Sequence, residues 1–239
     1  MNGVPKRAVY LELPDWQRDA RLVDLAGECV ALQRQGRTPV RATPDGCTAA
    51  RAAVSEPSLE ALLRRRVDVH GISLQPEISN AVVFDADEVA SAAHFAALRA
   101  ARATLDAHVA GKLRALFGDA GATVHASGHF WYPPGGYMGW HTNSRKPGWR
   151  FYVSYAEEAG RSFFRYRDPG SGEIITSMDG RWTFRLFRVD RRRPLWHAIY
   201  SDTDRFSFGY RLRPWSLKRA LRRRLRLAAG RFGVRADGA

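Results

Sequence analysis

The chain has 239 residues, of which 38 are Lys or Arg and 24 are Asp or Glu, so its formal net charge is +14. A composition that is 45% hydrophobic and 26% charged excludes a disordered or collagen-like protein. No segment approaches the roughly 20 apolar residues that a transmembrane helix needs. Two cysteines cannot build a disulfide framework or a four-thiolate zinc site. With no apolar leader behind the first basic residues, we expect a cytoplasmic protein.

The first half of the chain is expected to be helical and the second half to consist of strands. Residues 1–120 form a supporting region with a short strand at 7–12 and helices at 22–34, 58–67 and 87–117, and residues 36–55 are predicted as a loop. From 121 to 212 aromatic and β-branched residues alternate with polar ones, which is the strand period. Strands are predicted at 123–132, 137–143, 149–155, 162–167, 173–177, 181–189, 195–200 and 204–211. The fold class is therefore α+β, with a jelly-roll core in the C-terminal half and the helices packed on one face of it.

The positive charge is concentrated in residues 213–239, which we call the basic tail. Nine Lys or Arg and one Asp lie between Leu212 and Ala239, so this end carries +8 of the net charge. A helix is predicted at 216–231, with a leucine stripe flanked by arginines. Two interpretations stay open: the helix packs its leucines on the core, or it binds the phosphates of nucleic acid or an anionic membrane surface.

The last predicted strand carries the first functional signal. Because strand side chains alternate between faces, Phe206 and Phe208 point one way and Arg205, Ser207 and Arg211 the other. The aromatic face suits packing against helices. The second face suits a small dicarboxylate, because a buried guanidinium needs a carboxylate partner.

Two histidines on separate apolar strands, His141 and His197, carry the second signal. Strands that pair across a jelly roll bring such distant residues together, which favours a metal site. His125 and His129 are assigned to structure, because four residues of strand span roughly 13 Å. We expect the aromatic residues around His141 and His197 to shield the site from water: Trp140, Trp149, Phe151 and Trp196.

These residues resemble the iron(II)/2-oxoglutarate-dependent oxygenase superfamily, whose fold is the double-stranded β-helix. In that superfamily a metal-binding His is followed tens of residues later by a second one and then by an Arg or Lys that binds the far carboxylate of 2-oxoglutarate. His141, His197 and Arg205 match these positions in order. Arg205-Phe206-Ser207 is similar to the Arg-x-Ser element of the small-molecule oxygenases, which implies a co-substrate role for Ser207.

Further residues are implied by particular branches of the superfamily. AlkB-type demethylases and prolyl hydroxylases have a Tyr-x-x-Gly-x5-His pattern. The chain is similar here, with Tyr132-Pro133-Pro134-Gly135 followed by five residues and then His141. Tyr132 and Arg211 would then bind the co-substrate. Arg150, nine residues after His141, and Tyr152, two further on, resemble co-substrate ligands of the aspartyl hydroxylases. Arg211, Arg150 and Tyr132 remain candidates for the second carboxylate of 2-oxoglutarate or for the substrate.

Asn143 departs from the superfamily pattern, which has Asp or Glu at this position. A carboxylate completes the usual triad of two histidines and one acid. Asn143 would be a weak metal ligand, or the metal is held by two histidines, or the protein is an inactive member.

The resemblance implies a hydroxylase that uses Fe(II) and 2-oxoglutarate. Two alternatives stay open: a cupin-like metal protein, and an inactive binding protein on the same fold. The motif is shared by hydroxylases of amino acids, proteins, lipids and nucleotides, so it does not identify the substrate. We favour a small molecule or a protein side chain over nucleic acid, because most of the positive charge lies in the basic tail, for which we favour a structural role.

Overall fold

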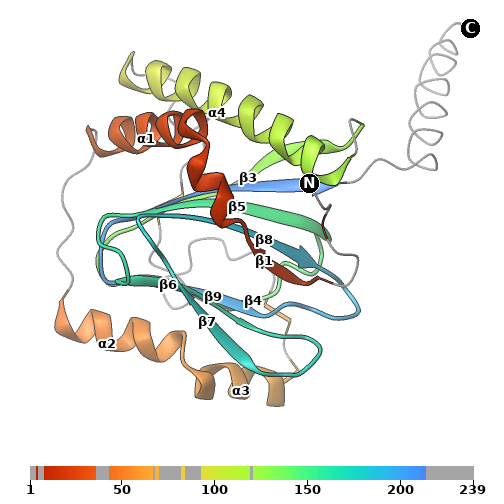
Figure 1. Cartoon of the computed structure of the whole chain (residues 1–239). Helices are drawn as coiled ribbons and strands as arrows, with labels where there is room; N and C mark the ends of the chain where they lie inside the picture. The colour runs from red at the N-terminus through yellow and green to blue at the C-terminus, as the bar shows by residue number, and fades with distance from the viewer. Residues whose placement is uncertain are drawn as a thin grey trace, which may run out of the picture.

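The computed structural model describes residues 4, 8–35, 43–66, 68–69, 82–83, 93–118 and 121–213. Two antiparallel sheets face each other, with a pair of helices above the larger sheet and another pair below the smaller one (Figure 1). The predicted α+β class and jelly-roll core are confirmed. Apart from Arg213, the basic tail lies outside the described residues, so the predicted helix at 216–231 does too. Within the described part of the chain no helix is long and apolar enough to cross a membrane.

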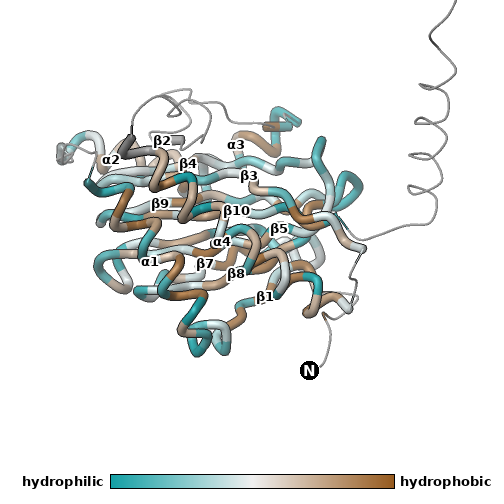
Figure 2. The backbone as a smooth tube through the Cα atoms, turned by 90° about the horizontal axis from the view of Figure 1, so that it is seen from above, coloured by the Kyte–Doolittle hydropathy of each residue, from teal (hydrophilic) through white to brown (hydrophobic). Residues whose placement is uncertain are grey.

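The larger sheet has six strands in the order β1-β8-β5-β10-β3-β2, and the smaller has four in the order β4-β9-β6-β7. Figure 2 shows the larger sheet from above, with the strands following one another from β3 to β1. The strands are β1 (Tyr10–Glu12), β2 (Val82–Val83), β3 (Thr123–Tyr132), β4 (Gly136–His141), β5 (Gly148–Ala156), β6 (Ser162–Arg167), β7 (Ile174–Met178), β8 (Trp182–Val189), β9 (His197–Ser201) and β10 (Arg205–Arg213). Each of the eight strands predicted after residue 121 is present.

The helices agree with the sequence except in one place. They are α1 (Ala20–Gln35), α2 (Pro44–Ala53), α3 (Glu56–Arg64) and α4 (Ala93–Phe117), with a 3-10 turn at Pro14–Arg18. The predicted loop at 36–55 is wrong, because α2 lies within it. Thr43 caps this helix by accepting a hydrogen bond from the Gly46 amide, and Pro44 occupies its first position, where a missing N–H costs nothing.

The main core lies between α1, α4 and the larger sheet. Leu105, Val109 and Leu113 recur at helical spacing on α4 and are fully buried, since this face of the helix packs on α1 and the sheet. From β10, Phe206, Phe208, Tyr210 and Leu212 point into this core. The helices thus cover the aromatic face of β10, and its other face is left to the space between the sheets.

A second pair of helices covers the outer face of the smaller sheet. Leu59 on α3 and Ala50 on α2 pack with Trp140 of β4, Tyr200 of β9 and Trp196, which directly precedes β9. The expectation that all helices lie on one face is therefore wrong. Trp140 and Trp196 face outward from the smaller sheet and need a cover of their own, which the helix α2, not predicted from the sequence, helps to supply (Figure 1).

Candidate functional site

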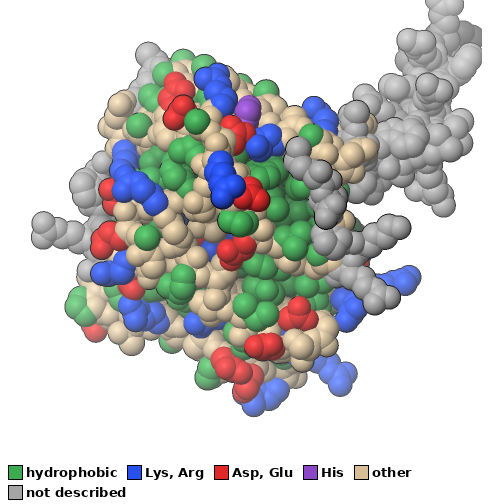
Figure 3. All heavy atoms as spheres, in the orientation of Figure 1, with side chains coloured by type: hydrophobic (Ala, Val, Ile, Leu, Met, Phe, Trp, Pro, Cys, Tyr) green, Lys and Arg blue, Asp and Glu red, His purple; other side chains and the backbone are tan. Residues whose placement is uncertain are grey.

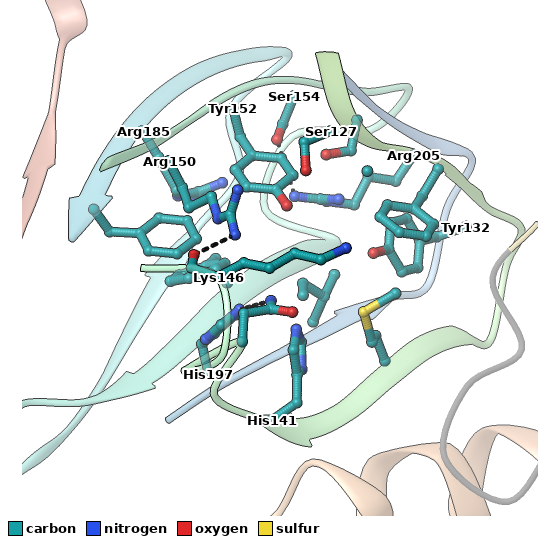
Figure 4. Close-up of a pocket in the computed structure, with 18 residues that line it drawn as sticks. Ser127, Tyr132, His141, Lys146, Arg150, Tyr152, Ser154, Arg185, His197 and Arg205 are labelled. Carbon is teal, nitrogen blue, oxygen red and sulfur yellow. Dashed lines mark hydrogen bonds between the residues drawn. The ribbon is translucent and has the colours of Figure 1, made fainter. Parts of the chain in front are cut away.

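An open pocket lies between the two sheets (Figure 4). Its walls come from β3, β5, β8 and β10 of the larger sheet and from β4, β6 and β9 of the smaller one. Eight of the nine residues that the sequence nominates line it: Tyr132, His141, Asn143, Arg150, Tyr152, His197, Arg205 and Ser207. Arg211 lies outside this lining.

The two histidines meet because their strands are neighbours. In the pairing of β4 with β9, His141 lies opposite His197, after a register shift that follows Met138. The ring centroids are 4.0 Å apart, and both side chains are at least 97% buried. Figure 4 shows both rings pointing into the pocket from the smaller sheet. Strand pairing thus brings together side chains that are 56 positions apart in the sequence.

The ring nitrogens are arranged as metal-binding histidines require. Nδ1 of His141 lies 2.8 Å from the Gly139 carbonyl oxygen, and Nδ1 of His197 lies 3.0 Å from that of Leu195. A carbonyl only accepts, so Nδ1 carries the proton and Nε2 keeps its lone pair. Burial is the main reason that the pKa of His197 lies well below its usual range, and the charge of His141 lowers it further. The imidazole pair therefore fits a divalent metal, which needs neutral rings.

Asn143 lies beside the two histidines, and no carboxylate of a described residue joins them. Its backbone has a φ of +55°, a left-handed conformation that asparagine tolerates better than most residues. Its Nδ2 lies 3.5 Å from Nε2 of His197. Among the described residues no three His, Cys, Asp or Glu side chains gather as a metal site. The donor set available here is thus two imidazoles and one carboxamide, whose oxygen is a neutral and weak ligand.

The loop that holds Asn143 is fixed by a residue from the N-terminal region. Asp68 accepts hydrogen bonds from Thr142 Oγ1 at 2.6 Å and from Ser144 Oγ at 2.8 Å. The Thr142 amide also donates to the Val69 carbonyl. Because residues 142 and 144 are held on one side, the residue between them is turned to the other side, toward the histidines. Asp68 was not predicted, and nothing in the spacing of residues 1–120 marks it.

Arg205 lies on the opposite wall, and its main partner belongs to the protein. Nε donates to Asp179 Oδ2 at 2.8 Å, Nη2 donates to Ser154 Oγ at 3.0 Å, and the guanidinium stacks 5.0 Å from the Tyr132 ring centroid. The carboxylate that the sequence analysis expected beside this buried charge is thus supplied, at Nε, by Asp179. Nη1, however, is buried with no partner among the described residues.

Asp179 joins two arginines in a buried ion cluster. Arg185 donates to its other carboxylate oxygen, and Ser162 Oγ donates to Oδ2 at 2.6 Å. Burial alone would raise the pKa of Asp179, but the charges of Arg185 and Arg205 outweigh it and hold this pKa well below the usual range. The cluster keeps one excess positive charge out of water. In the sequence Asp179 is a single acid in the turn between two predicted strands, and nothing there indicates the buried ion cluster.

Arg150 and Tyr152 lie on the same face of β5, as the sequence predicted, and this face lines the pocket. They alternate with Trp149, Phe151 and Val153, which lie in the helix-facing core. Arg150 is 97% buried, and its Nη2 donates to the Lys146 carbonyl at 2.8 Å. Tyr152 stacks on Phe187 with ring centroids 5.7 Å apart, and burial raises the pKa of its hydroxyl. Both side chains therefore belong to the pocket wall.

The predicted aromatic shield is wrong. Trp149 and Phe151 lie in the core under α1 and α4, whereas Trp140 and Trp196 face α2 and α3. Each is adjacent in sequence to a pocket residue, so strand alternation turns it away. The apolar lining is instead Phe130, Met138, Phe164, Phe187 and Ile199.

The structure separates His125 from His129, in agreement with their assignment to structure. His129 is buried and packs beside Phe208 and Tyr210 on the helix side, and His125 is exposed. A bulge between them accounts for this. Gly128 has a φ of +80°, and opposite it a Cβ on Gly209 would stand 2.2 Å from the Ser127 carbonyl oxygen. Only glycine permits this approach.

No protein-family model matches the chain, and no curated protein matches it in sequence. Several solved structures are similar in shape. A prolyl hydroxylase from Trichoplax adhaerens, in complex with a hypoxia inducible factor oxygen degradation domain peptide fragment, is 12% identical, with 82% of this chain and 92% of that chain covered at a TM-score of 0.41. A Pseudomonas putida prolyl-4-hydroxylase is 14% identical, with 72% and 89% covered at 0.37.

The third is dioxygenase for auxin oxidation 1 from Arabidopsis thaliana in a 2-oxoglutarate complex, which is 12% identical, with 88% of this chain and 85% of that chain covered at a TM-score of 0.43. These proteins are of the class that the sequence resembles. At such identities and TM-scores the likeness concerns overall shape and carries no argument about the reaction, which has to come from the site.

Proposed function

We propose that this chain is an Fe(II)- and 2-oxoglutarate-dependent oxygenase that hydroxylates its substrate. One observation carries the proposal. A pair of imidazoles stands on one wall of the pocket, and on another stands the buried Arg205 guanidinium, whose Nη1 has no partner among the described residues (Figure 4). A molecule that chelates a metal at one end and carries a carboxylate at the other satisfies both walls, and 2-oxoglutarate has that form.

Each nominated residue has a role in this proposal. His141 and His197 hold the metal through Nε2, with Asn143 as a weak third donor. Arg205 and Ser207 hold the far carboxylate, with the Arg205 fork fixed in place by Asp179 and Ser154. Tyr132, stacked on Arg205, completes this end. The remaining nominated residues are Arg150, Tyr152 and Arg211, which bind either the second carboxylate or the substrate.

When bound, the metal and 2-oxoglutarate activate dioxygen for oxidation of a C–H bond, and the chain's own part is orientation and the exclusion of water. Met138, Phe164 and Phe187 line the pocket near the histidines and keep water from the reacting centre. The Nδ1 contacts of both histidines hold the rings at a fixed angle.

For the substrate we favour a small molecule or a protein side chain, in a cytoplasmic enzyme. On the face shown in Figure 3, basic and acidic side chains are interspersed, which gives nucleic acid no continuous basic surface there. The Trichoplax enzyme binds a peptide, and the Arabidopsis enzyme acts on auxin.

Anaerobic titration with Fe(II) and then 2-oxoglutarate tests the metal site. We expect a weak visible charge-transfer band from the chelate in the wild type. His141→Ala and His197→Ala should lose Fe(II) binding, whereas His125→Ala, an exposed histidine of the same chain, should keep it. Iron binding of wild-type strength in either of the first two variants would refute the ligand assignment.

The co-substrate end is tested by the same titration on Arg205 variants. Arg205→Ala should weaken 2-oxoglutarate binding by about tenfold to several hundredfold, because a charge-assisted pair contributes roughly 1.5–3 kcal/mol or more. Arg205→Lys, which keeps the charge but loses the fork, should be intermediate. Fe(II) affinity without 2-oxoglutarate should barely change. Equal 2-oxoglutarate affinity in all three proteins would remove Arg205 from the site.

Asn143 favours one alternative, a binding protein on the same fold without turnover. A metal held by two imidazoles and a carboxamide is held weakly. The same titration separates the two functions, since a binder would take up 2-oxoglutarate or a related acid without iron and would not consume it in air.

A further inference from the structure

A second group of basic side chains begins at Arg150 in the pocket wall, away from Arg205, and continues beyond the pocket lining. Arg150 on β5 and Arg211 on β10 are register partners, and His125 on β3 is the next residue in the same row. Strand partners lie about 4.5–5.5 Å apart between Cα atoms, and like charges placed opposite each other destabilise a sheet. Arg213 lies two residues further along β10. Such a row of basic side chains needs a compensating negative charge.

The described part of the chain provides no such charge. Neither Arg150 nor Arg211 nor Arg213 forms an ion pair with a described residue. Nη1 of Arg150 and Nε of Arg211 are buried without a hydrogen-bond partner among those residues. Burial lowers the pKa of Arg150, and Arg211 and Arg213 lower it further, although Tyr152 opposes the shift. By contrast, Arg185 and Arg205 share the carboxylate of Asp179.

The two cationic ends are too far apart for one short dicarboxylate. Arg205 and Arg211 are separated by six residues of β10, about 20 Å of strand. Figure 4 shows Arg150 and Arg205 on opposite sides of the pocket, with Tyr152 and Ser154 between them. In Figure 4 the Lys146 side chain runs from the Arg150 side of the pocket toward Tyr132 and Arg205, and its ammonium forms no hydrogen bond or ion pair with a described residue.

We propose that Arg150 and Arg211 form a separate oxyanion site, which binds a carboxylate or phosphate group of the substrate. This inference rests on the proposed function in one respect, because it leaves the Arg205 end to 2-oxoglutarate. The charges agree with it. Among the described residues, the pocket lining contains Lys146, Arg150, Arg185 and Arg205 but no acid, and Asp179 is the acid that pairs with two of these arginines. A dianionic co-substrate leaves part of this charge for a second anion.

Calorimetric titration of the full chain with inorganic phosphate at constant ionic strength tests the site. The wild type should bind phosphate, and Arg211→Gln should bind it at least about tenfold more weakly, since one charge-assisted hydrogen bond is lost. The control is Arg188→Gln, which removes an exposed arginine from β8 at the register of Trp149, and it should bind phosphate as the wild type does. Acetate in place of phosphate shows which oxyanion the site prefers.

A second arm repeats the titration with 2-oxoglutarate at saturation under anaerobic conditions with Fe(II). Phosphate should still bind, Arg211→Gln should keep 2-oxoglutarate affinity within about twofold, and Arg205→Ala should keep phosphate affinity. Displacement of phosphate by 2-oxoglutarate would overturn the inference, because both ends would then serve one ligand. Equal phosphate affinity in wild type and Arg211→Gln, or no phosphate binding by the wild type, would overturn it as well.

The two proposals can fail separately. If 2-oxoglutarate does not bind but phosphate binding depends on Arg211, the oxygenase proposal fails and the oxyanion site stands. Stability gives an independent check that needs no co-substrate. Without phosphate, Arg211→Gln should unfold at the same or a higher temperature than the wild type, because it removes one of two like charges. Phosphate should raise the unfolding temperature of the wild type and not that of the variant. A variant that is less stable without phosphate would contradict the repulsion on which the inference depends.

Discussion

Asp179→Asn removes the negative charge from the ion cluster that fixes Arg205. The substitution keeps the shape of the side chain and leaves two arginines, each at least 98% buried, without a counter-charge. Breaking a buried pair in this way costs about 3–5 kcal/mol of unfolding free energy. For a chain of this length, that corresponds to a fall in the melting temperature of roughly 6–20 °C. Chemical denaturation followed by tryptophan fluorescence measures the free energy directly.

The pH dependence of this loss has a defined sign. The folded-state pKa of Asp179 is depressed, so its stabilising effect is complete above the unfolded-state pKa and is lost as the pH falls through the folded-state value. The difference between wild type and Asp179→Asn should therefore be constant near neutrality and shrink below about pH 4. Asp190→Asn, which breaks a pair 3.6 Å apart whose side chains are 46% and 38% exposed, is the control and should cost at most about 1 kcal/mol. An equal, small loss in both variants, or a difference that grows toward acid pH, would refute the cluster's role.

Three further predictions concern the loop at 142–144 and the bulge at Gly128 and Gly209. Asn143→Asp should tighten Fe(II) binding in a metal titration, since it supplies the missing carboxylate, and unchanged affinity would show that this side chain does not reach the metal. Asp68→Ala should weaken Fe(II) binding by about tenfold while costing little 2-oxoglutarate affinity, because it frees the two hydroxyls beside Asn143; a loss of stability without a change in metal affinity would make Asp68 merely structural. Gly209→Ala should cost about 3 kcal/mol of unfolding free energy, because its Cβ would meet the Ser127 carbonyl. Gly111→Ala, on an open side of α4, should instead raise stability by up to about 1 kcal/mol, and similar effects at the two glycines would contradict the packing described for the bulge.

Local patterns in the sequence predicted what depends on neighbours along the chain. The alternation of Phe206 and Phe208 with Arg205 and Ser207 is a property of one strand, and the structure keeps it. The same rule, applied to β4 and β9, would have turned Trp140 and Trp196 away from the pocket, so the predicted shield was wrong for a reason visible in the sequence. The helix at Pro44–Ala53 was missed because its start is rich in the residues that also build loops.

What the sequence did not reveal depends on contacts between distant segments. Asp68 hydrogen-bonds to Thr142, which is 74 positions away in the sequence, and Asp179 hydrogen-bonds to Arg205, which is 26 positions away. A single acid between two regular elements looks the same whether it faces water or a buried guanidinium. The pairing of Arg150 with Arg211 depends likewise on the register of β5 and β10, which no local pattern gives. The roles of the nominated residues in binding metal and co-substrate stay predictions.

The contact of Asp68 with the loop at 142–144 has a thermodynamic consequence. Thr142, the residue between His141 and Asn143, donates its amide to Val69 and its hydroxyl to Asp68, so the loop and the 68–69 segment are ordered together. A ligand that stabilises the ordered loop must therefore also stabilise the ordered 68–69 segment, and the coupling free energy is the same in both directions. Occupation of the histidine pair would then slow hydrogen exchange at the Thr142 amide, and the N-terminal half of the chain would sense a ligand that it never touches.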